Sequence, residues 1–114
     1  MDLEFPRGDT EVCKFKIKDK NGTELSLSNT DKLFFTVKKS PKSEEVAFQK
    51  TLTNGIELKD GYYYVTINSD DTAELNYGDY VYDIELKTGE GVVKTLTLGV
   101  ITLIDEVTFK GDES

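Results

Sequence analysis

The stretch that decides the fold is DTAELNYGDYVY, residues 71–82, which joins a short helical signal to the start of a strand. Asp71 and Glu74 stand three residues apart, which is the spacing of a capping box, and they predict one helical turn near residues 70–75. Beyond Gly78 every second residue is large and apolar or aromatic, and the run comprises Tyr80, Tyr82, Ile84 and Leu86. A period of two residues is typical of a strand with one buried face. The stretch therefore predicts a helical turn that leads into a half-buried strand.

The same alternation recurs elsewhere in the chain. Its clearest runs are Cys13, Phe15 and Ile17; Leu33, Phe35 and Val37; and Tyr63, Val65 and Ile67. Val46, Phe48 and Leu52 also share one face, so residues 46–52 are interpreted as a strand, with a short helix as the alternative at this length. Turn-forming dipeptides separate several runs, at Asn21-Gly22, Asn54-Gly55 and Asp60-Gly61. Near the C-terminal end the alternation changes phase across Gly99, which predicts a β-bulge near that residue. The pattern predicts an all-β sandwich or barrel of seven or eight short, mostly antiparallel strands.

The composition excludes several classes of function. The chain has 114 residues, a formal net charge of −8 and no histidine. Without histidine it offers neither a Ser-His-Asp triad nor a Cys-His pair nor an ordinary zinc site. An acidic surface repels the nucleic-acid backbone. We therefore expect no catalytic residues, no cofactor, no metal site, no nucleic-acid partner and no enzymatic activity.

The length and the lack of a linker predict one domain over residues 1–110, followed by a frayed polar tail over residues 111–114. The first residues lack the basic start and apolar run of a secretory signal, and no stretch approaches the length of a membrane span. Cys13 is the only cysteine and falls in phase with Phe15 and Ile17. We therefore interpret Cys13 as a small buried apolar residue in a chain that is synthesised in a cytoplasm and has no membrane partner.

Residues 71–82 resemble the turn and strand opening that carry the tyrosine corner of immunoglobulin-like β-sandwiches. In that motif, a tyrosine at the start of the strand donates a hydrogen bond to nearby backbone and pins the connection between the two sheets. Tyr80 is the first candidate for this role and Tyr77 is the second. The sequence lacks the disulfide and the core tryptophan of antibody domains, and Tyr82 stands where the second cysteine would be. The resemblance implies an immunoglobulin-like β-sandwich and implies nothing about activity.

Two further groups of side chains are candidate binding sites. Tyr62 and Tyr64 could form a stacking platform for sugar rings, which makes a carbohydrate-binding module the alternative function. Alternating tyrosines on strands more often pack against neighbouring strands. Asp70 and Asp71, near Asp79, are the acidic stretch to inspect for a calcium ion, although they lack the regular spacing of an EF-hand loop.

The order of turns and strand phases along the chain carries a second resemblance. Its segments are residues 5–10 (FPRGDT), 19–23 (DKNGT) with Leu25 and Leu27, 33–38 (LFFTVK), 54–56 (NGI), 71–73 with Leu75, 77–84 (YGDYVYDI), Gly99 with Ile101 and Thr102, and 106–108. This order resembles small structural proteins of bacteriophages and prophages in Gram-positive hosts. More loosely, it is similar to the N-terminal domain family of phage baseplate upper proteins. The resemblance implies a non-enzymatic virion component, made in the bacterial host cytoplasm, that packs against other virion proteins or against copies of itself.

Overall fold

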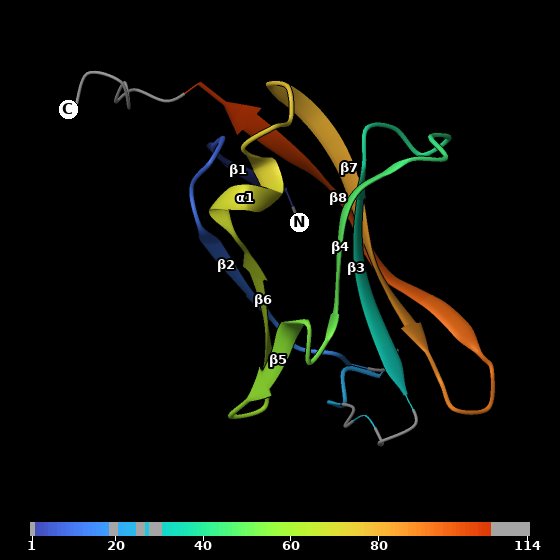
Figure 1. The fold of residues 1–114 in the computed structure, drawn as a ribbon. Helices are drawn as coiled ribbons and strands as arrows, with labels where there is room; N and C mark the ends of the chain where they lie inside the picture. Colours follow the sequence, from blue (N-terminus) through green and yellow to red (C-terminus); the bar gives the residue numbers. More distant parts are fainter. Residues whose placement is uncertain (1, 19–20, 25–26, 28–30, 106–114) are drawn as a thin grey trace.

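A computed structural model describes residues 2–18, 21–24, 27 and 31–105 of the chain (Figure 1). In chain order its elements are β1 (Leu3–Pro6), β2 (Glu11–Phe15), β3 (Lys32–Lys38), β4 (Val46–Leu52), β5 (Gly55–Lys59), β6 (Tyr62–Ile67), α1 (Ser69–Thr72), β7 (Gly78–Lys87) and β8 (Val93–Ile104). The described residues thus form eight strands and one short helix. The prediction of an all-β fold with a single helical turn is confirmed.

All eight strands belong to one mixed sheet, in the order β1-β8-β7-β3-β4-β5-β6-β2. The β1–β8 and β4–β5 pairs are parallel, and the other five pairs are antiparallel, as the sequence predicts for most of them. The β4–β5 pairing is short, because it joins only Thr51 with Gly55 and Leu52 with Ile56. This short pairing keeps all eight strands hydrogen-bonded in one sheet. The hydrogen-bonding pattern therefore does not by itself divide the strands into two layers.

The sheet curls until it almost closes into a barrel (Figure 1). Its two edge strands, β1 and β2, are consecutive in the chain and are joined by residues 7–10. In Figure 1, β3, β4, β7 and β8 form one side of the molecule, and β2, β5 and β6 form the other. The N–H of Gly8 donates a hydrogen bond of 2.8 Å to Oγ1 of Thr72, which ties the segment between the edge strands to α1.

The core lies inside the curled sheet and follows the predicted alternation. Its residues on β3, β6 and β7 are Leu33, Phe35, Val37, Tyr63, Val65, Ile67, Tyr80, Tyr82, Ile84 and Leu86. The ring centroid of Phe35 lies 5.1 Å from that of Tyr82 and 6.4 Å from that of Phe48. The pleat places successive side chains on opposite faces, so these strands show the period of two residues in their burial as well as in their sequence.

The helix is capped three residues earlier than predicted. The N-cap of α1 is Asn68, and Asp71 is its third helical residue. The N–H of Asn68 donates a hydrogen bond of 2.6 Å to Oδ2 of Asp71. The prediction that Asp71 caps the helix and pairs with Glu74 is therefore wrong. The physical reason is that β6 ends at Ile67, so the chain enters the helix directly after Asn68.

The bulge in β8 also differs from its predicted place. Ile84 pairs with Thr97 and Glu85 pairs with Thr95, so Leu96 is the extra residue. Gly99 pairs regularly with Tyr82, and the prediction of a bulge near Gly99 is wrong. The phase of the apolar residues changes because Leu98 pairs with Asp83 on the outer face and is 70% exposed, whereas Ile101 and Leu103 point into the core.

Several sequence predictions fall outside the described residues. They concern residues 19–20, Leu25 and residues 106–108 of the second resemblance, and the tail over residues 111–114. Lys18 and Glu24, which flank the predicted turn, form an antiparallel bridge.

Candidate functional site

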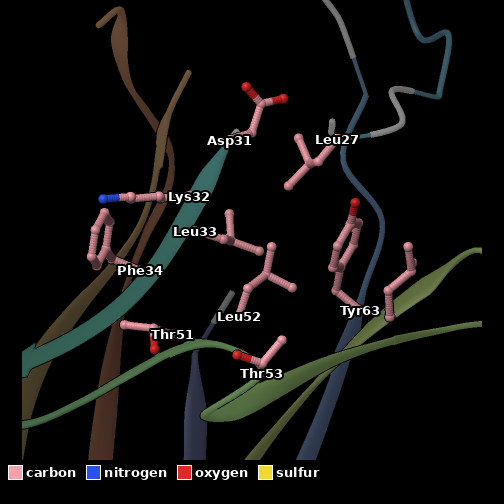
Figure 2. Close-up of a pocket in the computed structure, with 10 residues that line it drawn as sticks. Leu27, Asp31, Lys32, Leu33, Phe34, Thr51, Leu52, Thr53 and Tyr63 are labelled. Carbon is pink, nitrogen blue, oxygen red and sulfur yellow. The ribbon is translucent and has the colours of Figure 1, made fainter. Parts of the chain in front are cut away.

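The candidate site is a pocket between the two sides of the sheet (Figure 2). Its volume is about 600 Å³. It is lined by the start of β3, the end of β4, and by side chains from β5 and β6, namely Leu27, Asp31, Lys32, Leu33, Phe34, Thr51, Leu52, Thr53, Leu58 and Tyr63. None of these residues stands out as a site in the sequence, because the pocket forms only where the curl of the sheet brings β3 and β4 opposite β5 and β6.

The pocket has an apolar interior and a polar edge. Figure 2 shows Leu33 and Leu52 pointing into the space between the strands, with Leu27 and Tyr63 across from them. Asp31 stands at the edge, and its Oδ1 accepts a hydrogen bond of 3.0 Å from the N–H of Gly89. Such a lining can hold an apolar body and orient it through few polar groups.

Tyr63 is the one deeply buried polar side chain of the pocket lining. Its residue is only 2% exposed, and its ring stacks on Phe15 with centroids 5.5 Å apart. Burial raises the pKa of the Tyr63 hydroxyl above its ordinary value. The backbone of Leu27 lowers this pKa and so counters part of the shift, whereas the charge of Asp31 raises it further. The hydroxyl oxygen of Tyr63 is buried, and no described acceptor lies in hydrogen-bonding geometry with it. At neutral pH the hydroxyl is therefore a protonated donor without an acceptor in the described part of the chain.

The two candidates for the tyrosine corner lie beside α1. The hydroxyl of Tyr80, a residue 4% exposed, donates a hydrogen bond of 2.9 Å to the carbonyl of Asn76. Tyr77 is 42% exposed, and the guanidinium of Arg7 lies 4.2 Å from the centroid of its ring. Arg7 Nη1 also donates a hydrogen bond of 3.2 Å to the carbonyl of Leu75. Tyr80 thus contacts the backbone four residues upstream, whereas Tyr77 packs against the β1–β2 connection.

Tyr62 and Tyr64 lie together on β6, facing away from the core. Their ring centroids are 6.5 Å apart, and their planes are inclined by 59°. The ammonium groups of Lys14 and Lys16 lie 4.2 Å and 4.5 Å from the centroid of Tyr62. A sugar-stacking platform needs open aromatic faces in similar planes, so this geometry does not favour one.

A buried ion pair joins β4 to α1. Lys50 Nζ lies 2.7 Å from Asp71 Oδ2, and the two side chains are only 11% and 19% exposed. This pair was not predicted from the sequence, although the sequence carries a signal for it. Lys50 occupies the inward position between Phe48 and Leu52, and a lysine on an inward face needs a partner.

The acidic stretch and the cysteine singled out in the sequence do not form a binding site in the described part of the chain. Among those residues, no three His, Cys, Asp or Glu side chains are grouped so that they could hold a metal ion, and Asp70, Asp71 and Asp79 are no exception. Cys13 is half-buried on β2, and burial, with the charge of Glu11, raises the pKa of its thiol to about 11. No helix in the described residues has the length and apolar character needed to cross a membrane.

Comparison with known proteins leaves the chain without a family. No protein-family model matches the sequence, and no curated protein is significantly similar to it. The interpretation of the pocket and of the surface therefore depends on their own geometry.

The hydrogen bond of Tyr80 is expected to contribute to stability. Tyr80→Phe removes the donor to Asn76 and keeps the ring, so the free energy of unfolding should fall by about 1 kcal/mol, which is typical of one neutral hydrogen bond. Urea denaturation measures the change. Tyr64→Phe, on the outer face of the sheet, is the matched control. Equal effects of the two variants would mean that the Tyr80 bond does not stabilise the fold.

Proposed function

We propose that this chain is a non-enzymatic structural or assembly component of a bacteriophage or prophage particle, located in a tail or baseplate, and that it acts through protein–protein contacts. The resemblance of its turns and strand phases to phage structural proteins motivates the proposal. One observation on the surface supports it, namely the exposed apolar side chain of Leu98 beside a hollow in the outer face of β8, β7 and β3.

Leu98 is 70% exposed, although it lies within the longest strand of the sheet. The hollow beside it has a volume of about 240 Å³ and is lined by Leu98, Gly99, Val81, Tyr82, Asp83, Thr36, Lys38 and Pro41. Leu98, Val81 and Pro41 supply apolar surface, and Lys38 and Asp83 supply charges of both signs. An apolar centre with a polar rim is the usual anatomy of a protein interface.

The net charge bears on the kind of partner. At −8, two copies of the chain repel each other, and this repulsion favours a partner with a basic surface over self-association. A virion protein with a basic patch and an apolar side chain for the hollow would meet both requirements.

We further propose that the sheet is an immunoglobulin-like sandwich in which β1-β8-β7-β3-β4 forms one layer and β5-β6-β2 forms the other. The two-pair link between β4 and β5 supports this division, because it is the shortest pairing in the sheet. The bond from Tyr80 to Asn76 supports it as well, because a tyrosine corner lies at the connection that leads into such a strand.

The test co-expresses the chain with the tail or baseplate proteins that are encoded beside it and measures complex formation by size-exclusion chromatography with light scattering. We expect a stable complex with the wild-type chain and a loss of affinity of about tenfold or more with Leu98→Asp, as for an interface anchor. Leu58→Asp is the control, since Leu58 is 50% exposed and lies on β5, away from the hollow. Neighbouring genes unrelated to phage particles, or equal binding by both variants, would contradict the proposal.

A further inference from the structure

We propose that the open edge of β2 binds an extended segment of a partner protein, which joins the sheet as a further strand and carries apolar side chains on its inner face and a carboxylate on its outer face. This inference goes beyond the proposed assembly contact at Leu98, because it assigns a second interaction surface of a different kind. It also stands independently, since no residue of β2 lines the hollow beside Leu98.

The backbone of β2 has an unpaired side. β2 lies at one end of the strand order, and β6 is the one strand that pairs with it in the described part of the chain. Successive residues of a strand direct their N–H and C=O groups to opposite sides, so every second residue of Glu11–Phe15 directs these groups away from β6. Figure 1 shows β2 at the margin of the side that it forms with β5 and β6. An extended peptide can pair with such groups and lengthen the sheet by one strand.

β2 is also the least guarded of the open edges. Natural sheets block unwanted pairing with proline and with β-bulges on their edge strands. β1, the opposite edge, ends in Pro6. β4 is left open by its short pairing with β5, but its register shifts opposite Val37 and Lys38. β2 has neither feature, because its five residues pair with β6 in an unbroken register. The edge of β2 is therefore regular enough to pair with another strand.

The inner face of β2 is incompletely covered. Cys13 and Phe15 share the inward phase and pack against the core, yet both remain only half-buried. Their partners on β6, Val65 and Tyr63, are 0% and 2% exposed. The core is therefore closed beneath β6 and partly accessible beneath β2. Apolar side chains on an added strand would remove this surface from water, which favours binding.

The outer face of the edge indicates the charge of the partner segment. Lys14 is exposed, and its ammonium group lies 4.2 Å from the centroid of the Tyr62 ring on β6. The lysine thus extends over its own sheet and leaves the open side of β2 unobstructed. Lys16 is paired with Glu24, whereas no carboxylate in the described residues forms an ion pair with Lys14.

This arrangement favours a partner strand with a carboxylate on its outer face. Opposite charges on neighbouring strands stabilise a sheet, and like charges destabilise it. The ammonium group of Lys14 would therefore attract a carboxylate on the added strand and repel a lysine there. The net charge of −8 makes two copies of the chain repel each other, so it favours a different protein over a second copy as the occupant.

The test titrates a fluorescein-labelled peptide, in which valine and glutamate alternate and both ends are uncharged, with the full chain and follows fluorescence anisotropy. We expect saturable binding by the wild type. Affinity should be about threefold to tenfold lower for Lys14→Glu, because an attraction between neighbouring strands becomes a repulsion. Lys87→Glu is the matched control, since it makes the same change in net charge at the exposed end of β7 and should bind like the wild type.

Hydrogen exchange locates the bound peptide and keeps the test specific. A saturating concentration of peptide should slow amide exchange in β2 and leave β8 unchanged, because only groups that gain hydrogen bonds become protected. Leu98→Asp should bind the peptide like the wild type, so loss of this site and loss of the assembly contact can be distinguished. Absence of binding, protection outside β2, or equal affinity of Lys14→Glu and the wild type would overturn the inference. So would a dimer of the free chain, seen by light scattering, in which the amides of β2 are already protected.

Discussion

Lys50→Met is expected to lower the free energy of unfolding by about 3 kcal/mol, the cost of leaving one member of a buried ion pair without its partner. Methionine is one atom shorter than lysine but keeps an unbranched apolar stem, so packing between Phe48 and Leu52 is largely preserved. The carboxylate of Asp71, 19% exposed, then retains the hydrogen bond from the N–H of Asn68 but loses the cation at 2.7 Å. Urea denaturation followed by circular dichroism measures the change.

Two further variants separate the ion pair from a general effect of losing a lysine. Lys16→Met breaks a pair of similar length, 2.9 Å to Glu24, whose side chains are 28% and 54% exposed. Water already screens that pair, so its loss should have a much smaller effect. Lys50→Met combined with Asp71→Asn removes both charges and should recover part of the stability. If Lys50→Met and Lys16→Met were equally mild, the buried pair would not stabilise the fold.

Gly55→Ala should destabilise the chain by about 2 kcal/mol or more, because a side chain at this residue is strained in two ways. Gly55 opens β5 directly after the turn and has a φ of +102°, a conformation that residues with a Cβ rarely adopt. A Cβ atom there would also lie 2.5 Å from Cδ and 3.0 Å from Cβ of Lys50. Relief of this clash would displace the lysine stem and disturb its contact with Asp71.

Gly91→Ala is the matched control for backbone strain. Gly91 has a φ of +91°, and nothing lies within 4 Å of the position of an added Cβ. Its destabilisation, measured in the same thermal and urea experiments, therefore reports strain alone. In a Lys50→Ala background the excess effect of Gly55→Ala should shrink, because residues in contact are not additive. If Gly55→Ala and Gly91→Ala lowered the stability of the otherwise wild-type chain equally, the clash with Lys50 would not contribute to the destabilisation.

The strands were predictable where burial follows the local pleat. The predicted strand over residues 46–52 coincides with β4, and the run from Tyr63 to Ile67 lies within β6. Leu33, Phe35 and Val37 are buried as their alternation indicates. The helical turn was also predictable, but its cap was not. Both Asn68 and Asp71 are good N-cap residues, and only the end of β6 decides between them.

The pocket was not predictable from the sequence. Tyr63 belongs to a buried run and gives no sign of an unsatisfied hydroxyl, because that property depends on which groups of other strands surround it. Tyr62 and Tyr64, which the sequence does suggest as a platform, are tilted relative to each other, and two lysines lie over the ring of Tyr62. For Lys50, the sequence pattern indicated an inward position on the strand, but it did not indicate which residue would be the partner.

The sequence by itself determined that the chain is all-β, where most strands lie, and which faces of them are buried, because these properties follow from a two-residue period that each segment carries locally. The tertiary structure alone decided that β1 joins β8 in parallel, that Lys50 reaches Asp71, and that side chains of four strands line one pocket. Each of these brings together residues far apart in the chain. Such contacts depend on how the whole sheet curls, and no local pattern encodes them.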